Sequence, residues 1–291
     1  MQLKLYIYDS FTEEIFKGNQ AGIILDAENL KEEDMQKIAK ELNYSETAFL
    51  FKSKNAFKKI KFFTPNSEVD LCGHATIAAV KCLYDNNLLD LKEGENIINL
   101  ETNLGLLPVI INIKNDKFSN IVMYQDEAKI NDKIELEKAL ILNALGLTEA
   151  DSGNLEIVKA YTGLWDLMIS LKNKESLFNI KADMNKIKEI SKKLDIISFH
   201  PFVLENNNQL TAYVRNFAPI VDIDEEAATG TSNGALAYYL YKSNILKENE
   251  KLVCRQGEIM GRESEIITYV KEGKVLVGGT AIKVFEGILE I

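Results

Sequence analysis

The sequence contains few of the residues that crosslink small proteins or bind metals. Its 291 residues include three cysteines and two histidines. Cys72, Cys82 and Cys254 are too few for a disulfide scaffold, so we expect reduced thiols and a cytoplasmic location. The sequence has no Cys-x-x-Cys pair and no His-x-x-x-His pair, which are the spacings typical of zinc sites; its two histidines are His74 and His200. The sequence therefore predicts no metal site.

Positive charge and long apolar runs are also scarce. The chain has 34 lysines and arginines against 44 aspartates and glutamates, a formal net charge of −10. This balance disfavours binding to nucleic acid or to an anionic membrane surface. No apolar run approaches the ~20 residues that a membrane span needs, and the N-terminus lacks the pattern of a signal peptide. We therefore expect neither nucleic acid nor a membrane as a partner.

Sequence motifs for common cofactors are absent as well. There is no P-loop and no Gly-x-Gly-x-x-Gly dinucleotide fingerprint. If the protein is an enzyme, we expect its own side chains to carry the chemistry without a cofactor. Proton transfer fits that restriction best.

The sequence repeats one structural plan. Residues 31–42 and 183–194 both place apolar side chains at helical spacing. Each of these segments is followed by predicted strands, an acidic loop and a glycine, Gly73 or Gly230, that opens a helix of small apolar residues. A helix that is apolar nearly all round belongs in the interior of a protein. The recurrence predicts two similar domains.

Both domains are expected to belong to the α+β class. Their strands contain glycine and alternate apolar with polar residues, without the regular strand–helix–strand spacing of a parallel sheet. We therefore predict that each domain is a mostly antiparallel β-sheet wrapped around a central helix. Residues 1–125 are predicted as the first domain and residues 126–280 as the second. The sequence leaves open whether a last strand at 281–291 returns to the first domain.

The two glycine loops predict a binding site for an anion. Each loop leads into a helix N-terminus, where unpaired N–H groups and a partial positive charge favour a carboxylate. Gly73 and Gly230 would let such a group approach the backbone closely, and a cleft between domains is a common ligand site. The alternative is that both glycines only end strands and that Thr231 or Ser232 caps a helix.

Several side chains are candidates for proton transfer. Glu46 precedes an apolar segment, where partial desolvation would raise its pKa toward that of a useful base; alternatively, it is a capping or solvated glutamate. His74 lies at the start of a buried helix and is either an acid–base group or a capping or core histidine. Cys72 and Thr229 occupy equivalent places in the two halves. A thiol paired with a hydroxyl argues against a racemase that uses two thiols.

Seven short motifs, spread over nearly the whole chain, carry a family resemblance. In chain order they are Gly18-Asn19, Ser45-Glu46-Thr47-Ala48-Phe49, Phe62-Phe63-Thr64-Pro65, Cys72-Gly73-His74-Ala75-Thr76, Phe217-Ala218-Pro219, Ala228-Thr229-Gly230 and Gln256-Gly257. Together they resemble the PhzF-like family of phenazine-biosynthesis isomerases, in the fold group of diaminopimelate epimerase and proline racemase. The resemblance implies a diaminopimelate epimerase-like fold, a homodimer, and a biosynthetic isomerase that needs no metal or organic cofactor.

The resemblance also implies roles for individual residues. It makes Glu46 the base that takes a proton from one carbon and returns it to another, and it carries the family's Gly-His over to Gly73 and His74. The family's second-loop aspartate falls on Glu226 and its final serine on Thr231. These two departures from the family pattern predict shifted substrate contacts in the second loop.

The leading hypothesis is a cofactor-independent, PhzF-like isomerase that moves a proton on a small carboxylate-bearing metabolite. The predicted catalytic residues are Glu46, His74 and Glu226. The predicted substrate-binding residues are Ser45, Cys72, Gly73, Thr229, Gly230 and Thr231. Two alternatives stay open: an epimerase or dehydratase that uses Cys72 and Thr229, and a ligand-binding protein that has the fold without turnover.

Overall fold

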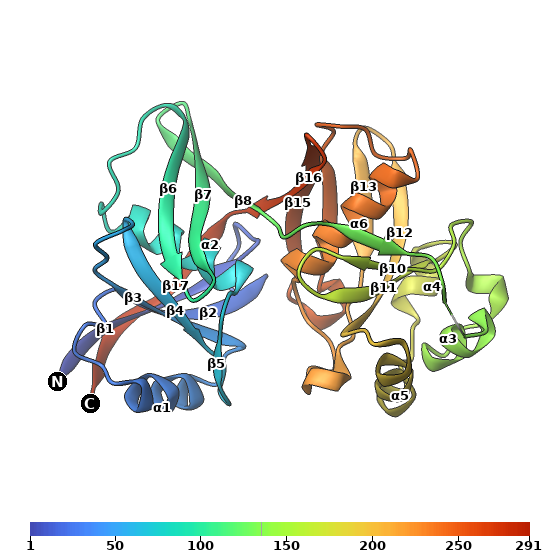
Figure 1. Cartoon of the computed structure of the whole chain (residues 1–291), viewed down its shortest axis with the longest axis horizontal. Coiled ribbons are helices and arrows are strands. Elements are labelled where there is room, and N and C mark those ends of the chain that lie inside the picture. Colours follow the sequence, from blue (N-terminus) through green and yellow to red (C-terminus); the bar gives the residue numbers. More distant parts are fainter. Residues whose placement is uncertain (135) are drawn as a thin grey trace. The chain divides into compact units, whose positions relative to one another are not determined.

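The computed structural model describes residues 1–134 and 136–291. These residues divide into two compact units, Met1–Met123 with Gly278–Ile291, and Tyr124–Val277. Within the described residues there are six α-helices and seventeen β-strands, most of them labelled in Figure 1. The protein is therefore an α+β protein, as the sequence predicted. No helix in this described part is long and apolar enough to cross a membrane.

The first unit contains both ends of the described chain. Its elements are β1 (Gln2–Ser10), β2 (Asn19–Ile24), α1 (Glu32–Leu42), β3 (Glu46–Phe51), β4 (Lys58–Phe63), β5 (Glu68–Val69), α2 (Gly73–Asp85), β6 (Gly94–Thr102), β7 (Gly105–Lys114), β8 (Lys117–Tyr124) and β17 (Ala281–Glu290). Strand β17 pairs antiparallel with β1 along the whole of β1. As a result, the two termini lie side by side in Figure 1.

Helix α1 covers part of the core of this unit. The sequence predicted a helix at 31–42, and α1 places Met35 and Ile38 on its buried face. It ends at Asn43, whose left-handed conformation (φ 53°) is one that asparagine tolerates better than most residues. Beneath α1, the buried rings of Phe49 and Phe63 meet edge to face at 5.5 Å. This packing fixes β3 and β4 against the helix.

Helix α2 is buried nearly all round, as its composition predicted. The side chains of Ala75, Ile77, Ala78, Ala79 and Val80 have no exposed surface. The helix packs against β1, β2, β3 and β17, and its small side chains allow this close approach. Because β3 begins with Glu46 and α2 with Gly73, this packing determines where the first turn of the helix lies relative to the first residue of the strand.

The second unit has a similar set of elements. They are β9 (Lys129–Asn131), α3 (Lys138–Ala144), β10 (Val158–Tyr161), β11 (Trp165–Ser170), α4 (Lys174–Phe178), α5 (Met184–Leu194), β12 (Ser198–Asn206), β13 (Leu210–Val214), α6 (Gly230–Lys242), β14 (Leu252–Gln256), β15 (Ser264–Lys271) and β16 (Lys274–Gly279), whose last residues belong to the first unit. Helix α5 corresponds to the helix predicted at 183–194. Helix α6 has 13 residues, as α2 does, and both begin with a glycine.

The sheet is mixed, with more parallel pairing than the predicted, mostly antiparallel arrangement suggests. Antiparallel pairs predominate, but β2–β3, β4–β6, β11–β12 and β13–β14 are parallel. In each of these four cases at least one helix lies in the chain between the two strands: α1, α2, α4 with α5, and α6. A helical crossover lets the second strand run in the same direction as the first. The irregular spacing of these crossovers concealed them in the sequence.

Candidate active site

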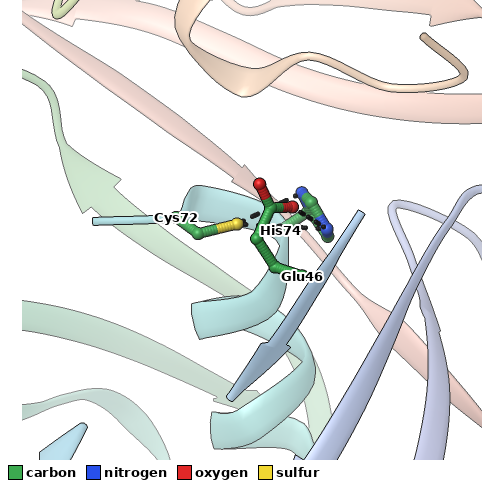
Figure 2. A group of neighbouring side chains, drawn as sticks. All are labelled: Glu46, Cys72 and His74. Carbon is green, nitrogen blue, oxygen red and sulfur yellow. Dashed lines mark hydrogen bonds and ion pairs between the residues drawn. The ribbon is translucent and has the colours of Figure 1, made fainter. Parts of the chain in front are cut away.

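Three polar side chains meet where β3 begins and α2 begins (Figure 2). Glu46 is the first residue of β3, Cys72 immediately precedes α2, and His74 is the second residue of the helix. Cys72 has extended backbone angles (φ −142°, ψ 119°), and its carbonyl accepts hydrogen bonds from the Thr76 amide (3.1 Å) and hydroxyl (2.7 Å). These bonds hold the entry to the helix in place.

The closest contact joins Glu46 and His74. The carboxylate oxygen Oε2 lies 3.1 Å from the imidazole nitrogen Nε2, and the two side chains are 18% and 6% exposed, respectively. Oε2 itself is buried, and within the described residues it accepts no well-directed hydrogen bond. A buried carboxylate oxygen with spare accepting capacity can take a proton from a bound molecule.

Two neighbours hold the imidazole ring. Asn19 Nδ2 lies 3.4 Å from His74 Nδ1, and Ser45 Oγ lies 3.3 Å from Nε2. Ser45 Oγ also lies within hydrogen-bond distance of Asn19 Oδ1, at 3.3 Å. Burial lowers the pKa of His74 below its ordinary value, although the negative charge of Glu46 and a hydrogen bond to the Gln20 backbone oppose this shift. The imidazole is therefore predominantly neutral at pH 7.

Cys72 brings a third kind of polar atom to the group. Its Sγ lies 3.4 Å from His74 Nδ1 and 3.9 Å from Nε2, and the residue is 8% exposed. One oxygen of Glu46, one nitrogen of His74 and the sulfur of Cys72 all lie within 4.8 Å of one another. The group thus combines a carboxylate, an imidazole and a thiol, each of which can exchange protons or bind a cation.

The second glycine loop is held by a buried glutamine. Gln256 Oε1 accepts hydrogen bonds from the Thr229 amide (3.2 Å) and from Asn233 Nδ2 (2.8 Å). Its Nε2 donates to the carbonyl oxygen of Glu226 (2.7 Å) and to Thr229 Oγ1 (3.1 Å). The Thr229 hydroxyl in turn donates to Glu226 Oε2 at 2.7 Å. One side chain therefore fixes the loop from Glu226 to the first turn of α6.

A buried polar network lies under the same turn of α6. Asp166 accepts a hydrogen bond of 2.6 Å from Ser198 Oγ. Asn216 Nδ2 donates to Ser198 Oγ (2.9 Å) and to Ser232 Oγ (3.0 Å), and it lies 3.1 Å from His200 Nδ1. Burial raises the pKa of Asp166 to about 6 and lowers the pKa of His200 to about 3. The network links the helix to strands β11 and β12.

The predicted residues thus form two groups, one in each unit. The first unit brings together four of them, Ser45, Glu46, Cys72 and His74, with Gly73 in the same loop. The second unit brings together Glu226 and Thr229 at the start of α6, where Gly230 and Thr231 are the first two helical residues. The Thr231 carbonyl accepts a hydrogen bond of 2.7 Å from Thr162 Oγ1.

Sequence reasoning gave no role to Asn19 and Gln256, although both are central to these groups. Both residues stand in the short motifs that carry the family resemblance, Gly18-Asn19 and Gln256-Gly257. In both motifs a polar residue stands next to a glycine, and this pattern was the signal in the sequence that could have pointed to the two residues.

Comparison with known proteins identifies the family. The model of the phenazine biosynthesis-like protein family, PhzC-PhzF, matches residues 8–287. The chain belongs to this family. An uncharacterized isomerase of Clostridium acetobutylicum is 36% identical, with 98% of this chain and 97% of the relative covered. The uncharacterized isomerase YddE of Escherichia coli K12 is 35% identical over the same shares of the two chains.

Solved structures agree with this membership. The PhzF family phenazine biosynthesis protein of Bacillus anthracis superimposes with a TM-score of 0.91 at 28% identity, and both chains are fully covered. A hydroxyproline epimerase of Agrobacterium vitis matches with a TM-score of 0.67 at 11% identity, covering 99% of this chain and 92% of that one. The second likeness shows that this PhzF family member shares its fold with that epimerase.

Proposed function

We propose that this PhzF family member is a cofactor-independent isomerase that moves a proton on a small carboxylate-bearing metabolite. The observation that carries the proposal is the contact of 3.1 Å between Glu46 Oε2 and His74 Nε2 in a largely buried setting. Two of its relatives are named isomerases, which supports the reaction class. The family model supports a biosynthetic role.

In this proposal Glu46 is the acid–base residue. Its carboxylate removes a proton from one carbon of the substrate and, as the carboxylic acid, returns that proton to another carbon. His74 packs against the carboxylate and keeps it in position, and Ser45 with Asn19 keeps the imidazole in position. General acid–base catalysis of this kind typically contributes ~10²- to 10⁴-fold in rate.

Substrate binding is proposed for the glycine loops. Apart from its chain neighbours and the backbone of its own helix, no described atom lies within 4 Å of a Cβ atom added at Gly73, so the backbone there is open to a ligand. N–H groups at the start of a helix favour a carboxylate, and we assign this role to Gly73 and Gly230 together with Ser45, Cys72, Thr229 and Thr231. Glu226, fixed by Thr229 and Gln256, is proposed to assist proton movement.

We extend the proposal to the domain architecture, the cellular location and the oligomeric state of the protein. We propose two diaminopimelate epimerase-like domains, each folded around its glycine-led helix, α2 or α6. We also propose a cytoplasmic homodimer that needs no metal or organic cofactor for turnover. Sedimentation of the purified protein tests the dimer: a single species with the mass of one chain would contradict it.

Exchange of substrate hydrogen with deuterated water tests the role of Glu46. The protein is incubated with a panel of cyclic and amino-acid carboxylates, and label incorporation is followed by mass spectrometry. We expect Glu46→Gln to lower incorporation at least ~100-fold. Glu95→Gln, at an exposed glutamate of β6, is the matched control and should retain it. Unchanged incorporation in Glu46→Gln would show that Glu46 is not the base.

A second candidate function uses Cys72. Its Sγ lies 3.4 Å from His74 Nδ1, so the thiol is placed to exchange a proton with the imidazole. An epimerase or dehydratase with Cys72 and Thr229 as its acid–base pair would be inactivated by iodoacetamide, and a bound carboxylate would protect it. If a carboxylate of this panel raises the melting temperature of the protein but no label is incorporated, a binding protein without turnover would be favoured instead.

A further inference from the structure

We propose that Gln256 is a positioning residue for Glu226: it fixes the direction of the hydrogen bonds in the second glycine loop, so that the Thr229 hydroxyl donates its only proton to Glu226. The arrangement of these bonds is independent of turnover, whereas its role in catalysis rests on the proposed function of Glu226. The same arrangement leaves Thr229 without a proton to give to a substrate. It therefore favours Glu226 over Thr229 as the acid–base group of this loop.

Gln256 stands at a well-defined point of the second unit. It is the last residue of β14, where it pairs with Val214 of β13 on one side and with Ser264 of β15 on the other. Its side chain has no exposed surface. The Ser264 hydroxyl donates to the carbonyl oxygens of Gln256 (3.1 Å) and Ala227 (2.9 Å), which ties the end of the strand to the loop. The side chain of Gln256 thus projects from a strand that is paired on both sides.

Backbone groups decide which way round the Gln256 amide lies. The Thr229 N–H only donates, and its nitrogen lies 3.2 Å from Oε1. The Glu226 carbonyl only accepts, and its oxygen lies 2.7 Å from Nε2. The flipped amide would set donor against donor and acceptor against acceptor. In the one orientation that satisfies both groups, the second hydrogen of Nε2 meets Thr229 Oγ1 at 3.1 Å.

Asn233 reinforces this orientation from the first turn of α6. Its buried Nδ2 donates to the Thr229 carbonyl at 2.9 Å, and its other hydrogen goes to Gln256 Oε1 at 2.8 Å. Gln256 thereby uses both hydrogens of Nε2 and both lone pairs of Oε1. A buried amide with four hydrogen bonds cannot turn without leaving polar groups unpaired, which is costly. The orientation of the Gln256 amide is therefore locked.

The locked amide decides the direction of the bond between Thr229 and Glu226. Thr229 Oγ1 accepts a hydrogen from Gln256, and it lies 2.7 Å from Glu226 Oε2. An ionised carboxylate only accepts, so the hydroxyl hydrogen points to Oε2. A threonine that precedes a helix commonly caps it through the side-chain oxygen, but Thr229, the N-cap of α6, makes no such bond. Its hydroxyl is engaged with Glu226 instead.

This arrangement gives the two residues different roles. The Glu226 amide donates to the Asn216 carbonyl at 3.1 Å, so both the backbone and the carboxylate of Glu226 are held. A carboxylate with a fixed orientation meets a substrate proton at a defined distance, and a displacement of ~1 Å can cost ~100-fold in rate. A hydroxyl whose hydrogen is engaged does not protonate a substrate. The geometry therefore argues against Thr229 as the acid of an epimerase that pairs it with Cys72.

A double-mutant cycle, read out by label incorporation from deuterated water, tests the positioning role. Gln256→Met keeps the length of the side chain and removes its four hydrogen bonds. We expect it to lower incorporation ~10- to 100-fold, the range for a hydrogen bond to a charged group. In a Glu226→Gln background the same substitution should lower incorporation by no more than ~2-fold, because residues that act through one another are not additive.

A purely structural role of Gln256 would produce equal losses in the two backgrounds, and that result would overturn the proposal. Gln36→Met, at a glutamine of α1 with a hydrogen bond to the Thr64 carbonyl, is the matched control and should retain incorporation. Thr229→Val is the second variant if Gln256→Met does not fold, since it keeps the shape of the side chain. It should lower incorporation by a similar factor, and Thr229→Ser, which has the hydroxyl, should recover most of that loss; no recovery would contradict the role of the hydroxyl.

Exchange of the Gln256 side-chain amide, followed by NMR with labelled glutamine, measures the hydrogen bonds without turnover. One amide pair should persist after transfer to deuterated water and be missing in Gln256→Met. In Thr229→Val one hydrogen of this pair should exchange faster, while the one bonded to the Glu226 carbonyl stays protected. A pair that exchanges at once, or that is unchanged in Thr229→Val, would overturn the arrangement. If the wild-type protein incorporates no label with any compound of the panel, the proposed function fails and the role in turnover with it, while this exchange still decides the arrangement.

Discussion

Asp166→Asn should change how the stability of the protein depends on pH. Asp166 is fully buried in the second unit, and burial raises its pKa from 3.8 to about 6. The folded protein therefore holds this proton more tightly than the unfolded chain does. The contribution of Asp166 to the free energy of unfolding is greatest below pH 4, and it is lost as the pH rises through 6.

The size of this effect follows from the two pKa values. A difference of about two in pKa corresponds to about 3 kcal/mol over the whole range, of which about 2 kcal/mol falls between pH 4.5 and pH 7.5. Asparagine does not ionise and can still accept the hydrogen bond from Ser198. The stability of Asp166→Asn relative to the wild-type protein should therefore increase by about 2 kcal/mol between these two pH values.

Urea unfolding of both proteins at pH 4.5 and pH 7.5 measures this difference. His200, whose pKa burial lowers to about 3, is present in both proteins, so its own pH dependence cancels. Asp116→Asn, at an exposed turn, is the control and should show no change beyond ~0.5 kcal/mol. A relative stability of Asp166→Asn that is the same at both pH values would refute the assignment of a raised pKa to this carboxyl group.

Two further predictions concern backbone space and core packing, and both are checked by urea unfolding at one pH. A Cβ atom added at Gly257 (φ +85°) would lie 2.3 Å from the Arg262 carbonyl oxygen, whereas one added at Gly261 (φ +66°) would have no described neighbour within 4 Å apart from the adjacent residues. Gly257→Ala should therefore lower the free energy of unfolding by about 2 kcal/mol more than Gly261→Ala does. Equal losses in the two variants would contradict the clash. Phe49→Ala should cost about 3–5 kcal/mol because the ring is fully buried. Phe285→Ala, at a ring that is 48% exposed, should cost less than ~1 kcal/mol; a comparable cost for both would argue against the packing around Phe49.

Local patterns predicted the helices better than the strand pairing. Helix α1 and helix α5 were found because their apolar residues recur every three or four positions, and helix α2 because small apolar residues cover it all round. The parallel pairs were missed because pairing direction depends on where a crossover returns the chain. That is a property of the packed unit, which no short segment encodes.

The candidate site shows the same limit. The residues beside Gly73 could be proposed from sequence because they are neighbours at one helix start. That Glu46 Oε2 reaches His74 Nε2 depends on how α2 packs against β3, which the sequence alone does not fix. The role of Gln256 was out of reach for the same reason: its four hydrogen bonds span residues 226 to 233 on a distant segment.

The pairing of β1 with β17 has a consequence for biosynthesis. The first strand of the chain lies between β2 and the last strand, so the first unit needs residues 281–290 to complete its sheet. The second unit, Tyr124–Val277, is continuous and has no such requirement. Domains generally fold as the ribosome delivers them, N-terminal domain first. We therefore expect the reverse order in this protein: the later-made unit can fold while the earlier-made one still lacks strand β17.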